Sequence, residues 1–177
     1  GIISIIFQYY QFEEWSKEGS SRSIDHNHIQ FHATNRSAYG MELISSGKHE
    51  WSIKSTFSSG LKCQWIGIAS DFTALEDSNW GPFCMIWCNG CNAIQGYIES
   101  SAYFNGALVR VKPEDSWKSG DCITIKLDLD QQTISWYKNK DLAPVATYND
   151  VPKASYKVAV LGCSNHSFEI MKEVSHY

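Results

Sequence analysis

The chain has 177 residues, a formal net charge of −4 and no cluster of Lys or Arg. This charge disfavours sequence-independent binding to nucleic acid or to an anionic membrane surface, because both need a basic surface. Seven Trp, nine Tyr and eight Phe, with only four Pro, favour a single all-β domain with a substantial core. No apolar run approaches the roughly 18 residues that a membrane-spanning helix needs.

Residues 1–12 are apolar, and their spacing fits one face of a helix and the alternation of a strand equally well. We expect residues 1–14 to form an accessory segment packed on the body. Residues 15–172 are expected to form the β domain, and residues 173–177 a C-terminal tail. Because the chain starts at Gly and not at Met, we expect a monomeric domain that belongs to a larger protein.

From Trp15 onward the sequence predicts short strands separated by polar turns. Besides the hairpin described next, strands are expected at residues 21–25, 28–33, 39–44, 48–57, 63–70, 83–88, 93–98, 107–111, 143–148, 156–162 and 167–171. Polar loops are expected at residues 32–38 and 71–82. Many short strands without a helical period predict two antiparallel sheets packed as a sandwich.

Residues 120–139 carry the clearest hairpin pattern in the chain. Ile123, Ile125, Leu127 and Leu129 alternate with polar residues, which is typical of a strand with one buried face. The alternation resumes after Asp130, so two antiparallel strands are expected to meet at a short turn.

Five segments, in this order, resemble the motifs of the SPRY domain family. They are residues 46–51 (SGKHEW), 66–69 (IGIA), 78–81 (SNWG), 127–139 (LDLDQQTISWYKN) and 156–160 (YKVAV). The resemblance covers about residues 15–172, and it is nearest to the SPRY domains of SOCS-box proteins because residues 72–75 (FTAL) resemble their Y-T-A-L loop. No SOCS box follows in this sequence. Gln132 and Lys140 stand where the family has Gly, so both are expected to need a left-handed backbone.

The resemblance implies a bent sandwich of the concanavalin-like jelly-roll type, which acts as a non-catalytic protein-interaction module without a cofactor. SPRY domains commonly sit in ubiquitin-ligase subunits and scaffold proteins. The partner would be a protein or a short peptide, held by loops that meet on one surface. We expect the 71–82 loop to supply an apolar wall from Phe72, since this residue takes the place of the Tyr in Y-T-A-L.

Further binding residues are expected in three loops, because a sandwich uses its strands for the core. The candidate binding residues are Asn35, Arg36, Tyr39, Asp71, Phe72, Trp80, Asn165 and His166. Aromatic side chains among them would concentrate the binding energy, while the polar ones would form hydrogen bonds with the peptide. Trp80 could instead fold back and cap the sandwich.

Two other classes of function remain open. A lectin-like sandwich could hold a sugar with Asp71, Asn79 and Trp80, usually together with Ca²⁺. A metal site could use Cys84, Cys88 and Cys91, whose spacing brings three thiols together. We favour a simpler interpretation, in which Cys84 and Cys88 lie on one face of a strand and Cys91 lies in a turn. No nucleophilic elbow or phosphate-binding loop supports an enzyme.

The six cysteines are expected to be reduced and free of metal, because a domain of this size has enough core to fold without disulfides. Reduced thiols predict a cytoplasmic or nuclear protein. Two Asn-x-Ser sequences, at residues 35–37 and 165–167, keep a secreted alternative open.

Overall fold

The computed structural model describes residues 15, 22–25, 27–32, 36–57, 64–70, 83–89, 93–99, 107–110, 117–162 and 164–171. For residues 22–24, 36, 83–89, 93–99 and 107–110 it describes the backbone alone. Every regular element in this part of the chain is a strand, and no helix here is long and apolar enough to cross a membrane.

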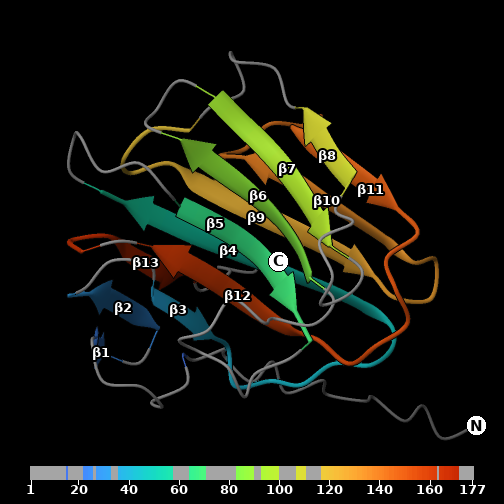
Figure 1. Ribbon diagram of the computed structural model, residues 1–177, viewed down its shortest axis with the longest axis horizontal. Helices are drawn as coiled ribbons and strands as arrows, with labels where there is room; N and C mark the ends of the chain where they lie inside the picture. The colour runs from blue at the N-terminus through green and yellow to red at the C-terminus, as the bar shows by residue number, and fades with distance from the viewer. Residues whose placement is uncertain are drawn as a thin grey trace, which may run out of the picture.

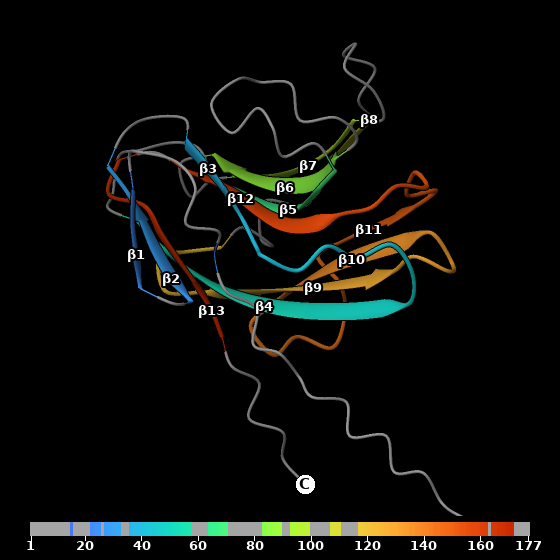
Figure 2. The same ribbon diagram turned by 90° about the horizontal axis from the view of Figure 1, so that it is seen from below.

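The strands form two antiparallel sheets (Figure 1), which pack face to face, as Figure 2 shows. The seven-stranded sheet has the order β1 (Arg22–Asp25), β2 (His28–Phe31), β13 (Ser167–Ile170), β4 (Lys48–Thr56), β9 (Cys122–Asp128), β10 (Thr133–Lys138) and β11 (Ala146–Asn149). The six-stranded sheet has the order β3 (Arg36–Tyr39), β12 (Lys157–Gly162), β5 (Gln64–Ala69), β6 (Phe83–Asn89), β7 (Ala93–Glu99) and β8 (Ala107–Arg110). The predicted all-β sandwich is therefore confirmed.

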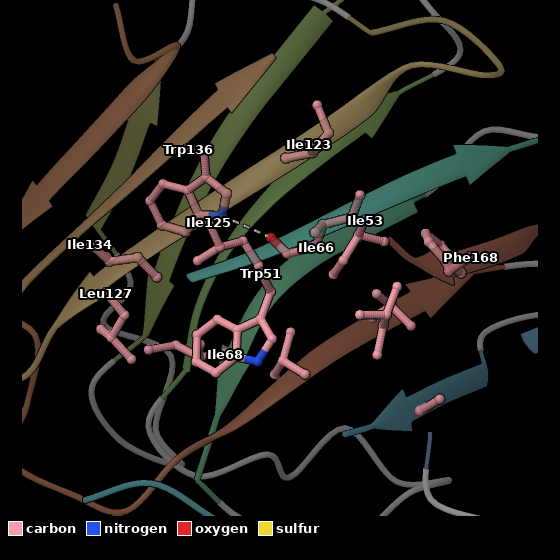
Figure 3. Close-up of a cluster of buried hydrophobic side chains, with 14 of the residues drawn as sticks. Trp51, Ile53, Ile66, Ile68, Ile123, Ile125, Leu127, Ile134, Trp136 and Phe168 are labelled. Carbon is pink, nitrogen blue, oxygen red and sulfur yellow. Dashed lines mark hydrogen bonds between the residues drawn. The ribbon is translucent and has the colours of Figure 1, made fainter. Parts of the chain in front are cut away.

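The hydrophobic core lies between the two sheets, where the inward-facing aliphatic and aromatic side chains meet (Figure 3). Trp136 of β10 is 1% exposed, and its indole N–H donates a hydrogen bond of 3.1 Å to the carbonyl oxygen of Ile66 in β5. This bond connects the seven-stranded sheet to the six-stranded sheet through the middle of the core. The alternation that predicted the hairpin corresponds to this buried face, since Ile123, Ile125 and Leu127 are all buried.

The predicted hairpin is formed by β9 and β10, which pair from Thr133 opposite Asp128 to Lys138 opposite Ile123. Gln132 has a positive φ of 54°, as expected for a residue at a glycine position of the family. The expectation for Lys140 is wrong. In the turn after β10 it is Asn139, and not Lys140, that takes the left-handed conformation, with φ 53°. Asn is suited to that conformation, and its side-chain oxygen accepts a hydrogen bond of 3.0 Å from the backbone N–H of Cys122.

The structure corrects the predicted strand at residues 39–44 and the loop before it. β3 occupies Arg36–Tyr39. Beyond it, Gly40 donates its N–H to the carbonyl oxygen of Val158 (2.8 Å), and Ile44 pairs with Tyr156 as an isolated bridge. Ser37, Ala38 and Tyr39 are all buried, because pairing with β12 carries this short strand into the sheet. Polar residues at positions 35–37 suggested a loop, but tertiary pairing decides the local structure here.

The strand ends gather at two opposite ends of the sandwich. At one end, named here the Asn165 end, β2 stops at Phe31, β3 starts at Arg36, β12 stops at Gly162 and β13 starts at Ser167. At the opposite end, the Gly47 end, β4 begins and the β9–β10 turn lies next to it. Gly47 has φ 81°, donates its N–H to Asp130 Oδ1 (3.1 Å) and accepts the N–H of Leu129 (2.9 Å). Glycine is favoured here because a side chain would strain this left-handed backbone.

Candidate functional site

The turn between β12 and β13 is held tightly against β2 at the Asn165 end. The N–H of Asn165 donates to the carbonyl oxygen of Phe31 (2.9 Å), and the N–H of Phe31 donates to the carbonyl oxygen of His166 (2.9 Å). Asn165 has φ 66°, a conformation that Asn tolerates better than most residues, and it is exposed. This turn therefore presents the Asn165 amide to solvent from a fixed backbone.

A cluster of aromatic rings packs against the core side of this turn. His166 is 0% exposed, and its ring lies 6.0 Å from the ring of Phe57, centroid to centroid. Phe31 and Phe168 are also fully buried and meet edge to face at 5.9 Å. Burial lowers the pKa of His166 below its ordinary value of 6.5, because the charged imidazolium is costly away from water. The histidine is consequently a neutral core residue near pH 7.

A buried polar group anchors neighbouring segments at the same end. Gln64, at the start of β5, accepts hydrogen bonds through Oε1 from the Ser55 hydroxyl and from the Trp117 indole N–H, the latter at 3.2 Å. Ser55 and Trp117 are fully buried, and Gln64 is nearly so. These contacts tie β4, β5 and the segment before β9 together behind the exposed turn.

Two of the predicted binding residues lie in the core. Tyr39, on β3, is 2% exposed, and His166 is fully buried. The prediction that their side chains reach a ligand from the surface is therefore wrong. Tyr39 is buried by the pairing of β3 with β12, and His166 is buried because its turn folds over Phe57.

The other predicted residues divide into one exposed residue and several outside the described part of the chain. Asn165 lies on the surface, as expected. Arg36 starts β3 next to this turn, since it pairs with Gly162, but its side chain is outside the described residues. Asn35, Asp71, Phe72 and Trp80 also lie outside the described residues, so their roles, like the alternative lectin set that includes Asn79, remain predictions.

The anchor points of the 71–82 connection lie at the Gly47 end. β5 ends at Ala69, which pairs with Lys157 on one side and with Phe83 on the other. Arg36 and Gly162 lie at the opposite end of the same sheet. For Phe72 to join Asn165 on one surface, the connection must run back along the sheet. Phe72 follows Ala69 by only three residues, which span at most about 10 Å, whereas a six-residue strand is about 20 Å long, so Phe72 is out of reach of the Asn165 end.

The outer face of the seven-stranded sheet is polar, and its groups largely satisfy one another. Lys48 pairs with Asp128 (3.4 Å) and Lys126 with Glu50 (3.5 Å), while the hydroxyls of Ser52 and Thr124 are 2.8 Å apart. The N–H of Gln131 and the ammonium of Lys48 lower the pKa of Asp128. Such a face is well suited to contact with water, so ligand contacts are expected at the ends of the sandwich.

Sequence reasoning missed the exposed apolar residues of the described surface. Met41, Leu43 and Met171 are 59%, 56% and 38% exposed, and Leu142 is 99% exposed. Leu142 lies in the β10–β11 turn at the Asn165 end. No periodicity distinguishes these residues from core positions, because each lies beyond the regular part of a strand.

The cysteine positions fit the simpler interpretation where they can be followed. Cys84 and Cys88 both lie on β6, four residues apart and thus on the same face. Cys91 is outside the described residues. Among the residues with described side chains, no three His, Cys, Asp or Glu gather closely enough to hold a metal ion, and Cys122 is a free thiol. Burial is the main cause that raises the pKa of Cys122, which disfavours a reactive thiolate.

Comparisons with known proteins place this fold among SPRY domains. No protein-family model matches the sequence, and no curated protein matches it. The structure of the TRIM65 PSpry domain superposes with a TM-score of 0.70 at 8% identity, covering 92% of this chain and 93% of that one. The SPRY domain of human HERC1 superposes with a TM-score of 0.63 at 18% identity, covering 89% and 96%. The chain is thus a β-sandwich with the SPRY fold.

Proposed function

We propose that this domain is a non-catalytic recognition module that binds a short peptide, or an exposed segment of a partner protein, at the Asn165 end. The observation that carries the proposal is the turn between β12 and β13, in which a backbone fixed by hydrogen bonds to Phe31 displays Asn165 next to a buried aromatic cluster. A rigid site loses little conformational entropy when a ligand binds, so a few polar contacts suffice for affinity.

The SPRY fold supports this function over an enzyme. The described buried polar groups, Gln64 and His166 among them, lie within the structural core. SPRY domains commonly occur in ubiquitin-ligase subunits and scaffold proteins, so we propose that this domain selects a partner for such an assembly. Arg36, which starts β3 next to this turn, and Asn35 before it would form the margin of the site.

The test begins with a peptide library displayed on phage and selected against the intact domain. A selected peptide is then measured by fluorescence polarisation with three variants. Asn165→Gly keeps the left-handed backbone accessible and removes only the side chain, so it should weaken binding about three- to tenfold, the loss of one hydrogen bond. Phe72→Ala should leave the affinity unchanged, because Phe72 lies within about 10 Å of Ala69 at the Gly47 end.

Lys153→Ala serves as the matched control, because Lys153 is exposed in the segment between β11 and β12, at the Gly47 end. It should leave the affinity unchanged. Melting temperatures of all three variants must stay close to that of the parent, so that a loss of affinity reports the contact and not unfolding. Equal affinity of the parent and the Asn165→Gly variant for every selected peptide would refute the proposed site, and a loss of affinity with Phe72→Ala alone would place the site at the Gly47 end.

A further inference from the structure

Three consecutive apolar residues are exposed in the turn between β10 and β11. Leu142 is 99% exposed, and Ala143 and Pro144 beside it are also exposed. Single exposed apolar residues are common, but a run of three in contact with water is usually kept only where it serves a contact. These three residues, named here the Leu142 turn, are therefore a candidate contact surface at the Asn165 end.

Hydrogen bonds fix the chain on both sides of the Leu142 turn. Before the turn, the backbone N–H of Asn139 donates to the carbonyl oxygen of Cys122 (2.6 Å). After the turn, the N–H of Val145 donates to the carbonyl oxygen of Trp136 (2.7 Å). The turn projects from a fixed base, so a partner that binds it has little conformational freedom to remove.

An exposed strip connects the Leu142 turn with the turn that carries Asn165. It runs over the segment just before β9, where Ser119 is exposed. On one side, the N–H of Phe57 donates to the Ser119 hydroxyl (2.9 Å), and the Phe57 ring lies 6.0 Å from the ring of His166. On the other side, the side-chain amide of Asn139 donates to Asp121 Oδ1 (3.2 Å). The two turns therefore belong to one surface.

The length of this strip follows from the order of the strands. β13, β4, β9 and β10 are successive neighbours in the seven-stranded sheet. Adjacent strands are about 4.8 Å apart, so β10 lies about 14 Å from β13. An extended peptide advances about 3.3 Å per residue, so about four or five residues cover this distance. A peptide held at one point by Asn165 can therefore reach the Leu142 turn.

The charges along the strip favour an acidic ligand. Lys118, Lys138 and Lys140 lie here together with two carboxylates, Asp121 and Asp141. Asp121 already accepts two hydrogen bonds from the fold, at 2.7 Å and 3.2 Å. The balance of this strip is thus positive, although the whole chain has a net charge of −4. Opposite charges on two surfaces favour their association and fix the register.

We propose that the Leu142 turn is the apolar anchor of the Asn165 site. Its ligand is an extended segment of a partner protein with a large aliphatic or aromatic residue about four or five positions from the residue that Asn165 holds. An acidic residue lies between these two. The inference rests on the proposed function and adds the sequence class of the partner. The apolar residue of the partner would pack against Leu142 and Pro144 and remove both from water, which supplies affinity, while the polar contacts set the position.

Peptides selected on the intact domain by phage display test this anchor. Leu142→Ser should weaken their binding about four- to tenfold, which corresponds to burial of about half of a Leu side chain. Leu43→Ser is the matched control and should leave the affinity unchanged, because Leu43 is also an exposed Leu but lies next to the Ile44–Tyr156 bridge at the Gly47 end. Replacing the acidic residue of the peptide by its amide should weaken binding about two- to fivefold at low salt.

The outcomes separate this inference from the proposed function. A loss of affinity with Asn165→Gly but not with Leu142→Ser would overturn the apolar anchor and leave the proposed function standing. No loss with either variant would refute both, and a loss with Leu142→Ser alone would refute the Asn165 contact and the combined site with it. Equal losses with Leu142→Ser and Leu43→Ser would also overturn the inference, since they indicate unspecific apolar contact. So would a dimer of the parent chain, seen by sedimentation velocity, that Leu142→Ser abolishes, because a second copy would then cover the turn.

Discussion

Gly162→Ala should destabilise the domain, because the methyl group would enter a fully packed site. A Cβ atom at this position would lie 3.0 Å from ring carbons of both Phe31 and Phe168, and 3.1 Å from Cβ of His166. These three neighbours are fully buried, so none can turn its side chain into solvent. At least one ring must therefore move against other core atoms.

The magnitude follows from two opposing effects. Overpacking of a core by one carbon typically costs about 1–3 kcal/mol. Replacing Gly with Ala also reduces the entropy of the unfolded chain, which recovers about 0.4–1 kcal/mol. We expect a net loss of about 1–2 kcal/mol in the free energy of unfolding, equivalent to a fall of about 2–8 °C in melting temperature.

Urea unfolding followed by Trp fluorescence measures this loss directly, and a second substitution tests its cause. Phe31→Leu removes one of the two ring contacts, so it should be tolerated better in the Gly162→Ala background than in the parent. If Gly162→Ala leaves stability unchanged or raises it, the close contacts inferred around β12 are wrong. Simple addition of the two losses would place the strain elsewhere.

Three further predictions concern single residues. The free energy of unfolding should fall as the pH drops below about 6.5, because His166 binds a proton more readily in the unfolded chain than in the fold, where burial lowers its pKa. The His166→Gln variant should show a flatter pH profile in this range. An identical profile in the variant would exclude His166 as the cause. Gln132→Gly should be about 1 kcal/mol more stable than Gln132→Ala, because both remove the side chain but only Ala keeps the cost of a left-handed backbone. Lys140→Gly should be no more stable than Lys140→Ala, because Lys140 does not have a positive φ. Urea unfolding of the four variants measures both differences. Trp136→Phe should cost about 1–3 kcal/mol by losing ring volume and the hydrogen bond to Ile66, and a calorimetric loss below about 0.5 kcal/mol would contradict this role.

The sequence predicted the fold well where one face of a strand is buried. The alternation of Ile123, Ile125 and Leu127 determines both the strand and its inward face, and the apolar run at β5 indicated a central strand. The left-handed Gln132 was predicted by its place in the family motif. These features are local, so a pattern of a few residues is sufficient to reveal them.

The candidate site was predicted less well, because burial at the strand ends depends on distant segments. Tyr39 was expected on the surface, but β12 is more than a hundred residues further along the chain and pairs with β3 there. His166 is polar and follows Asn165 in a turn, yet the fold places its ring against Phe57 and leaves only Asn165 exposed. A neighbouring pair of polar residues gives no local signal of which one points inward.

The pairing of early with late strands has a consequence for how the protein is made. β2 pairs with β13, β3 pairs with β12, and the Asn27–Ile170 hydrogen bond spans 143 residues. During synthesis neither sheet can be closed until the final strands leave the ribosome, at about 5–20 residues per second. Until then β4 and β5 each keep one edge without a partner, and such an edge can pair with another chain. A chain truncated after β11 should therefore aggregate, and the nascent domain should bind chaperones until its last strands are made.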